Sequence, residues 1–180
     1  MNGDGWDDLL VCGIKEGSHL FINDKRGNFT ELATPATAVP WPDARLVDMN
    51  GDGRDDLVLV SNDNVFQVWL NTGVAPYFTA PSFSYALPGV GASLATGDFD
   101  HDGRKDVYVV LQDPDCETSL VDLAPDIVFW GQAGGRYVAQ AQPQDYAGCG
   151  HLADTVDGDK VLLEQGGEGY KGGTYVIRWK

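Results

Sequence analysis

Oxygen-bearing side chains recur at alternate positions of a short acidic segment. In residues 48–56 they occupy positions 1, 3, 5 and 9, as Asp48, Asn50, Asp52 and Asp56. Residues 98–106 repeat the pattern with Asp98, Asp100, Asp102 and Asp106. Oxygen ligands that converge from a tight loop suit a hard divalent cation, and the glycine at position 6 of each segment permits the sharp bend. We therefore predict two complete Ca²⁺ sites.

A shortened copy of the segment opens the chain. Residues 1–8 match positions 2–9, which leaves oxygen ligands at Asn2, Asp4 and Asp8 and none for position 1. We expect an incomplete third calcium site of lower affinity. Because natural domains rarely begin inside such a loop, we also expect the chain to be a fragment or a subunit whose fold another chain completes.

Other metal sites fit the segments less well. An EF-hand requires glutamate at position 12 and a helix on each side. Position 12 is Leu59 in one copy and Val109 in the other, and both flanks are strand-like. Oxygen-only ligands disfavour zinc and copper, and magnesium demands a stricter octahedron. Calcium remains the prediction, with a mainly structural role.

Short apolar runs follow each acidic segment and predict β-strands, at residues 9–12, 57–60 and 107–110. A second strand is expected at residues 20–22, 65–70 and 127–130, and a third near Phe29, Phe78 and Tyr137. Strands at 44–47 and 93–96 precede the second and third segments. A four-stranded antiparallel unit with a period of about fifty residues, and with no amphipathic helix, indicates propeller blades.

The predicted fold is all-β, a single partial β-propeller of about 3.5 blades over residues 1–180, with the calcium loops between the first and second strands. The expected units are residues 1–40 without a first strand, 41–90, 91–149 with an insertion at 112–125, and a degenerate, incomplete 150–180. An incomplete propeller would expose edge strands and aggregate, so self-association or completion by another chain is expected.

These segments resemble the FG-GAP/VCBS repeat family, whose units build the calcium-binding propellers of integrin α-chains and of many secreted bacterial and fungal proteins. The resemblance covers essentially the whole chain. It is specific at residues 48–56 and 98–106, strong at 1–8 and weak at 150–180. It implies that the backbone carbonyl of position 7 is a further metal ligand, in the three copies Trp6, Arg54 and Arg104. It also implies an extracellular, cell-surface or periplasmic location.

Charge and hydropathy exclude some partners. The formal net charge of −15 would repel nucleic acid and anionic membrane surfaces. No apolar run is long enough to span a bilayer, so no membrane span is predicted.

The tryptophans and cysteines supply the remaining candidates. Trp69 and Trp130 alternate with apolar neighbours and are expected in the core, whereas Trp41 and Trp6 lie in expected loops and are candidates for exposed contacts with a ligand such as a sugar ring. The insertion is another candidate binding feature. Cys12 is expected to be a buried free thiol. Pairing of Cys116 with Cys149 stays open.

Catalysis finds little support in the sequence. The three histidines are spread over different units, and neither a G-x-S-x-G elbow nor a His-x-x-x-His pair is present. We predict a non-enzymatic, calcium-binding propeller module that mediates glycan or protein binding, or adhesion. Two alternatives stay open: the scaffold of a polysaccharide lyase or hydrolase, and a purely structural accessory domain.

Overall fold

The computed structural model describes residues 1–13, 17–38, 40–61, 63–112, 124–142, 151–165 and 174–177. Over these residues the chain forms β-strands and one short 3₁₀ helix, η1 (Pro35–Ala38). The all-β class predicted from the sequence is therefore confirmed. Within the same residues, no helix has the length and apolar character needed to cross a membrane.

The strands form four small antiparallel sheets in chain order, numbered here sheets 1 to 4. Sheet 1 consists of β1 (Leu9–Val11), β2 (His19–Asn23) and β3 (Phe29–Glu31). Sheet 2 consists of β4 (Asp43–Val47), β5 (Asp56–Ser61), β6 (Val65–Trp69) and β7 (Phe83–Ala86). Sheet 3 consists of β8 (Val90–Gly97), β9 (Asp106–Gln112), β10 (Ile127–Gln132) and β11 (Arg136–Ala141). Sheet 4 consists of β12 (His151–Val156), β13 (Lys160–Gln165) and β14 (Thr174–Ile177).

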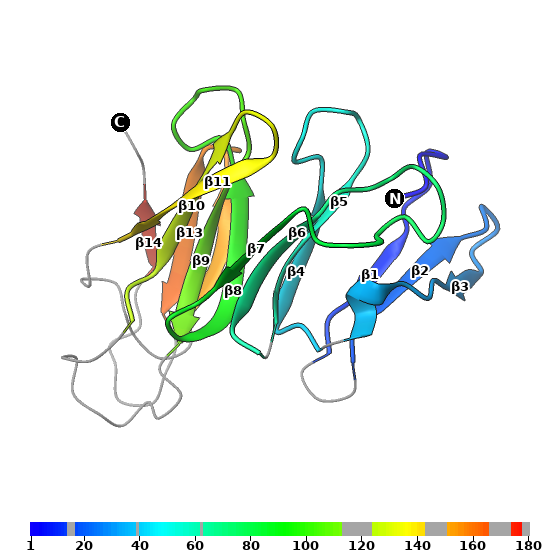
Figure 1. The fold of residues 1–180 in the computed structure, drawn as a ribbon, viewed down its shortest axis with the longest axis horizontal. Coiled ribbons are helices and arrows are strands. Elements are labelled where there is room, and N and C mark those ends of the chain that lie inside the picture. The colour runs from blue at the N-terminus through cyan, green and yellow to red at the C-terminus, as the bar shows by residue number, and fades with distance from the viewer. Residues whose placement is uncertain are drawn as a thin grey trace.

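Neighbouring sheets share cores; Figure 1 shows sheet 1 at the right, sheet 2 in the middle, and sheets 3 and 4 overlapping at the left. In sheet 2, Leu57 and Leu59 belong to the core shared with sheet 1, while Val58 and Val60 belong to the core shared with sheet 3. Every residue of β5 is buried, because both faces of its sheet are covered. This explains why the strands after the acidic segments are continuous apolar runs instead of alternating ones.

The first strands of successive sheets lie side by side: β4 beside β8, and β8 beside β12. Polar contacts join them, since the Ser93 hydroxyl donates to Asp43 Oδ2 at 2.8 Å and the Thr155 hydroxyl donates to the Thr96 carbonyl at 2.6 Å. Sheets 2 and 3 thus each place their first strand against the next sheet. Small sheets stacked in this way are consistent with a partial propeller-like fold.

One predicted strand was wrong. The third strand of the second unit was expected near Phe78, but β7 begins at Phe83. Phe78 lies instead in the long connection between β6 and β7, fully buried in the core between sheets 1 and 2. An aromatic residue in a loop can enter a core as readily as one in a strand, and the turn chemistry before it gave no sign of this. Most of the predicted insertion, at 113–123, lies outside the described residues.

Candidate functional site

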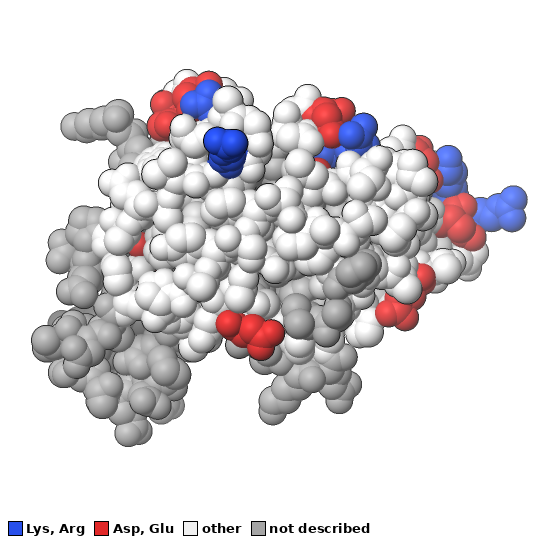
Figure 2. Space-filling view, in the orientation of Figure 1, with Lys and Arg blue, Asp and Glu red and all other residues white. Residues whose placement is uncertain are grey.

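The three acidic segments lie along one edge of the stacked sheets. Loop 1 (residues 1–8) precedes β1, loop 2 (residues 48–56) joins β4 to β5, and loop 3 (residues 98–106) joins β8 to β9. Figure 1 places loops 2 and 3 at the top of their sheets. Figure 2 shows acidic and basic side chains gathered along this edge, above a face with few charges.

Backbone amides fix the carboxylate at position 1 of the complete loops. Asp48 accepts hydrogen bonds from the N–H of Gly51 at 2.7 Å and from that of Gly53 at 2.8 Å. Gly53 has a φ of +81°, which an L-residue rarely adopts. Burial opposes the charge of Asp48, but the backbone N–H groups outweigh it and lower its pKa. The carboxylate is therefore held ionised and inside the turn.

Positions 3 and 5 are oriented by bonds within the loop. Asn50 Oδ1 accepts from the N–H of Asp52 at 2.8 Å, and Asp52 Oδ1 accepts from the N–H of Arg54 at 2.9 Å. The guanidinium of Arg54 also lies 2.5 Å from the other oxygen of Asp52. Loop 3 repeats these bonds with Asp100, Asp102 and Arg104.

The aspartate at position 9 is buried in both complete loops. Asp56 accepts from the N–H of Met49 at 3.0 Å and from that of Asn71 at 2.8 Å. Asp106 makes the corresponding bonds with Phe99 and Gly131, each at 2.8 Å. Burial, and to a lesser degree the neighbouring loop carboxylates, raises the pKa of Asp56 and of Asp106. A carboxylate so disfavoured by burial and like charge is the kind that a bound cation would stabilise.

The loop 3 carboxylates converge. One oxygen each from Asp98, Asp100 and Asp106 lies within 4.8 Å of the other two. A set of oxygen donors held by backbone N–H groups fits a hard cation such as Ca²⁺ by its chemistry. Coordination by Asp102 and by the position 7 carbonyls of Arg54 and Arg104 stays a prediction.

Loop 1 has the same internal pattern with fewer carboxylates. Asn2 Oδ1 accepts from the N–H of Asp4 at 3.0 Å, and Asp4 Oδ1 accepts from that of Trp6 at 3.0 Å. Asp8 accepts from the N–H of Asn23 at 2.9 Å, as Asp56 does from Asn71. The loop backbone is thus built alike in all three copies.

The comparison with protein families agrees with this repetition. A family model described as FG-GAP-like repeat matches residues 1–57 and again residues 48–109, together more than half of the chain. The chain belongs to the FG-GAP-like repeat family. No curated protein matches the chain.

Among the aromatic candidates of this FG-GAP-like repeat protein, Trp41 was wrongly expected to be exposed. It is fully buried in the core between sheets 1 and 2, with its backbone N–H bonded to the Ser18 hydroxyl at 2.9 Å. Its loop runs beneath the sheets, where a large apolar ring is buried more favourably than exposed. Trp6 is 53% exposed and stays a candidate contact. Trp69 is buried, as expected.

The prediction that Cys12 is buried was also wrong. Cys12 follows the end of β1 and is exposed. Cys12 lies one residue beyond the strand, so an apolar sequence run was not enough to bury the thiol. Cys116 and Cys149 lie outside the described residues.

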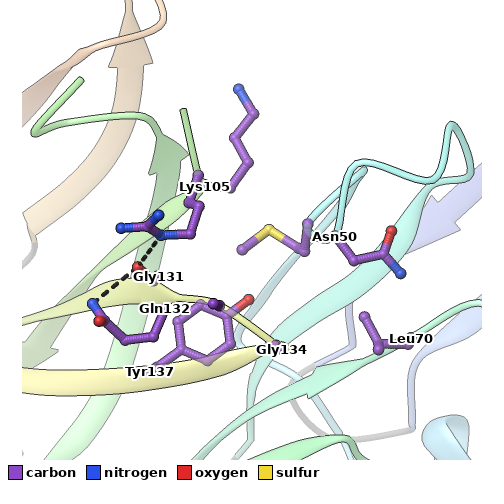
Figure 3. A pocket seen from close by; sticks show the side chains of 11 residues that line it. Asn50, Leu70, Lys105, Gly131, Gln132, Gly134 and Tyr137 are labelled. Carbon is purple, nitrogen blue, oxygen red and sulfur yellow. Dashed lines mark hydrogen bonds between the residues drawn. The ribbon is translucent and has the colours of Figure 1, made fainter. Parts of the chain in front are cut away.

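Sequence reasoning missed a cavity of about 270 Å³ between loops 2 and 3. Its apolar lining includes Met49, Leu70 and Tyr137, and its mouth includes Asn50 and Lys105. Figure 3 shows that these residues come from loop 2, from the end of β6, and from loop 3 and β11. The one available signal was at the residue whose N–H bonds to the position 9 aspartate, which is asparagine in the first two units and Gly131 in the third.

Proposed function

We propose that this chain is a calcium-binding, β-propeller-like module of an extracellular or surface protein that mediates protein or glycan binding, with calcium as a mainly structural ligand. The observation that carries the proposal is the repeated loop, with position 1 held by backbone N–H groups and position 9 buried. The FG-GAP-like repeat supports it at the level of the fold.

Calcium would stabilise the folded chain by binding it in preference to the unfolded chain. In loop 2 the candidate ligands are Asp48, Asn50, Asp52 and Asp56, and in loop 3 they are Asp98, Asp100, Asp102 and Asp106. A bound cation would offset the mutual repulsion of these carboxylates and hold the first and second strands of each sheet at a fixed separation. Loop 1 would bind more weakly, since it supplies one ligand fewer.

Chelation tests this part of the proposal. We expect EGTA to lower the melting temperature of the wild-type chain, and Asp52→Ala to remove most of the calcium-dependent stabilisation from loop 2. Asp55→Ala is a matched control, because Asp55 lies in the same loop at a position outside the candidate ligand set. Calorimetric scans that are identical in calcium and EGTA would contradict the metal assignment.

A second observation supports the proposed association with another sheet. Leu9 and Val11 of sheet 1 are 44% and 38% exposed, although Leu57 and Leu59, which hold the same places in sheet 2, are fully buried against sheet 1. The outer face of sheet 1 therefore carries the apolar pattern of a covered face. We propose that a second copy or another chain covers it.

Sedimentation tests the association. We expect a concentration-dependent dimer or larger assembly, and Leu9→Glu should shift the equilibrium towards monomer. Val74→Glu is a control, because Val74 is exposed on a different surface, in the connection between β6 and β7. A well-folded monomer at all concentrations would contradict this proposal.

The rival enzymatic function, as scaffold of a polysaccharide lyase or hydrolase, has no specific observation in its favour among the described residues. The same holds for a purely structural accessory domain. A polysaccharide cleavage assay, run beside a glycan and peptide binding screen, separates these alternatives from the binding module.

A further inference from the structure

The cavity between loops 2 and 3 has mainly apolar walls. Met49 and Leu70 come from sheet 2 and its loop, while Tyr137 and the turn at Gly134 and Gly135 come from sheet 3. In Figure 3 the Tyr137 ring forms one side, and the Lys105 side chain rises from the mouth, away from that ring. With about 270 Å³, the space is sufficient for one large side chain.

We propose that this cavity receives an apolar side chain, aromatic by preference, from a partner protein segment that places a carboxylate beside it for Lys105. The inference deepens the binding role proposed above and rests on it. It assigns protein, instead of glycan, as the ligand of this particular site.

The polar groups around the cavity already make hydrogen bonds within the chain, and this favours a protein side chain over a sugar as the ligand. The Asn50 amide donates to Asp52 Oδ2 at 3.0 Å, and the Gln132 amide donates to the Gly131 carbonyl at 2.9 Å. The Arg104 Nε–H donates to that same carbonyl at 2.8 Å. Because these groups already make hydrogen bonds, a sugar ring would bury several hydroxyls without partners. The free-energy cost of those unpaired hydroxyls would exceed the gain from burying the apolar faces of the ring.

The neighbouring interface shows which kind of group closes such a space. Between sheets 1 and 2, the connection from β6 to β7 folds back and buries its own aromatic side chain, Phe78. Between sheets 2 and 3, the corresponding connection from β10 to β11 is only a tight turn at residues 133–135. An aromatic side chain from another protein would fill the space between sheets 2 and 3, as Phe78 fills the space between sheets 1 and 2.

The positive charge of Lys105 at the mouth of the cavity favours a carboxylate next to the inserted side chain. Position 8 is Asp7 in loop 1 and Asp55 in loop 2, but Lys105 in loop 3. Within the described residues Lys105 has no ion pair, and its long stem can swing its ammonium towards a ligand. A partner carboxylate beside the inserted ring would form an ion pair with Lys105, since loop 3 is the one of the three loops with a cation at position 8.

Short capped peptides test the proposal on the whole chain in calcium-containing buffer. We expect acetyl-Gly-Phe-Asp-Gly-amide to bind saturably in NMR titrations, with the largest shift changes at Tyr137 and Leu70. Replacing its Phe by Ser should weaken binding about tenfold or more, since burial of the ring is lost. Replacing its Asp by Asn should weaken binding by up to about fivefold, the size expected for an exposed ion pair.

Variants locate the binding. Leu70→Phe should fill the cavity and abolish binding, whereas Val74→Phe adds the same ring to an exposed position and should leave it unchanged. Lys105→Gln should remove the preference for Asp over Asn and keep the preference for Phe over Ser. Circular dichroism of each variant verifies that it is folded.

Three outcomes would overturn the proposal: no saturable binding of the Phe-Asp peptide, binding that survives Leu70→Phe, or stronger binding of a methyl hexoside than of the peptide. Chelation separates the two proposals. Peptide binding to a chain whose melting temperature ignores EGTA would refute the calcium role alone. A chain stabilised by calcium that binds no peptide would refute the cavity assignment alone.

Discussion

The interface between sheets 1 and 2 is closed at the loop edge, whereas the interface between sheets 2 and 3 is hollow there. In the first, the Asn71 amide donates to the carbonyls of Met1 at 2.8 Å and of Asp55 at 2.9 Å, and so joins the two sheets. In the second, Gly131 stands at the corresponding place, with a cavity beside it. The residue whose N–H bonds to the position 9 aspartate therefore decides whether two repeat units are joined or leave a space.

The glycine has a physical reason of its own. A Cβ at Gly131 would lie 2.4 Å from the Lys105 carbonyl oxygen, closer than atoms can approach. The chain passes so near loop 3 that a side chain at this place has no room. The third unit thus packs its backbone tightly against its own loop, and it gives up the side-chain link to the preceding sheet.

The largest expected effect is at the closed interface. Asn71→Ala should lower the free energy of unfolding by about 2–4 kcal/mol, because it leaves the buried Met1 carbonyl and the partly buried Asp55 carbonyl without their donor. Gln132→Ala, at the hollow interface, should change it by less than about 0.5 kcal/mol, since that side chain is exposed and bonds only within its own strand. Urea denaturation measures the free energy of unfolding of both variants. Similar losses of stability would contradict the proposed difference between the two interfaces.

A pH-dependent difference is expected at the opposite end of sheet 3. Asp126 is buried, and it accepts hydrogen bonds from the Tyr108 hydroxyl at 2.8 Å and the Leu111 N–H at 2.9 Å. The corresponding place in sheet 2, by strand register, is the apolar residue Phe66. Burial raises the pKa of Asp126 from 3.8 to about 6 in spite of these bonds.

Because the folded-state pKa is raised, the stability contributed by Asp126 is present below pH 3.8 and is lost as the pH rises through about 6. Asp126→Asn removes this titration. We expect the free energy of unfolding of the variant, relative to wild type, to rise by up to about 3 kcal/mol between pH 4 and pH 7. Denaturation curves at the two pH values measure this difference, and a constant offset would contradict it.

The smallest expected effect concerns filling the two interfaces. Leu70→Phe should be near neutral, because the added atoms enter the cavity. Ile22→Phe, at the corresponding place in sheet 1, should cost about 1–3 kcal/mol, because Ile22 packs against a filled core. Thermal denaturation compares the pair. Equal losses of stability in the two variants would mean that the cavity is closed in the chain without a ligand.

The sequence predicted the features that depend on local chemistry. Alternating oxygens around Gly53 and Gly103 specify the loop turns, since few residues other than glycine accept the required φ. Apolar runs such as Leu57–Val60 specify strands buried on both faces, and the period of the loops specifies a repeated sheet. These properties lie within one unit and need no knowledge of its neighbours.

Tertiary structure decided the features that depend on which unit lies beside which. Cys12 and Leu57 both belong to apolar runs, but Leu57 is fully buried against sheet 1, whereas Cys12 lies just beyond the end of its strand and is exposed. Trp41 was expected in an exposed loop and Phe78 in a strand, but both are connection residues buried between sheets 1 and 2. The cavity beside Tyr137 has the same origin. Burial is a property of the pair of surfaces in contact, and one strand's sequence contains only half of that pair.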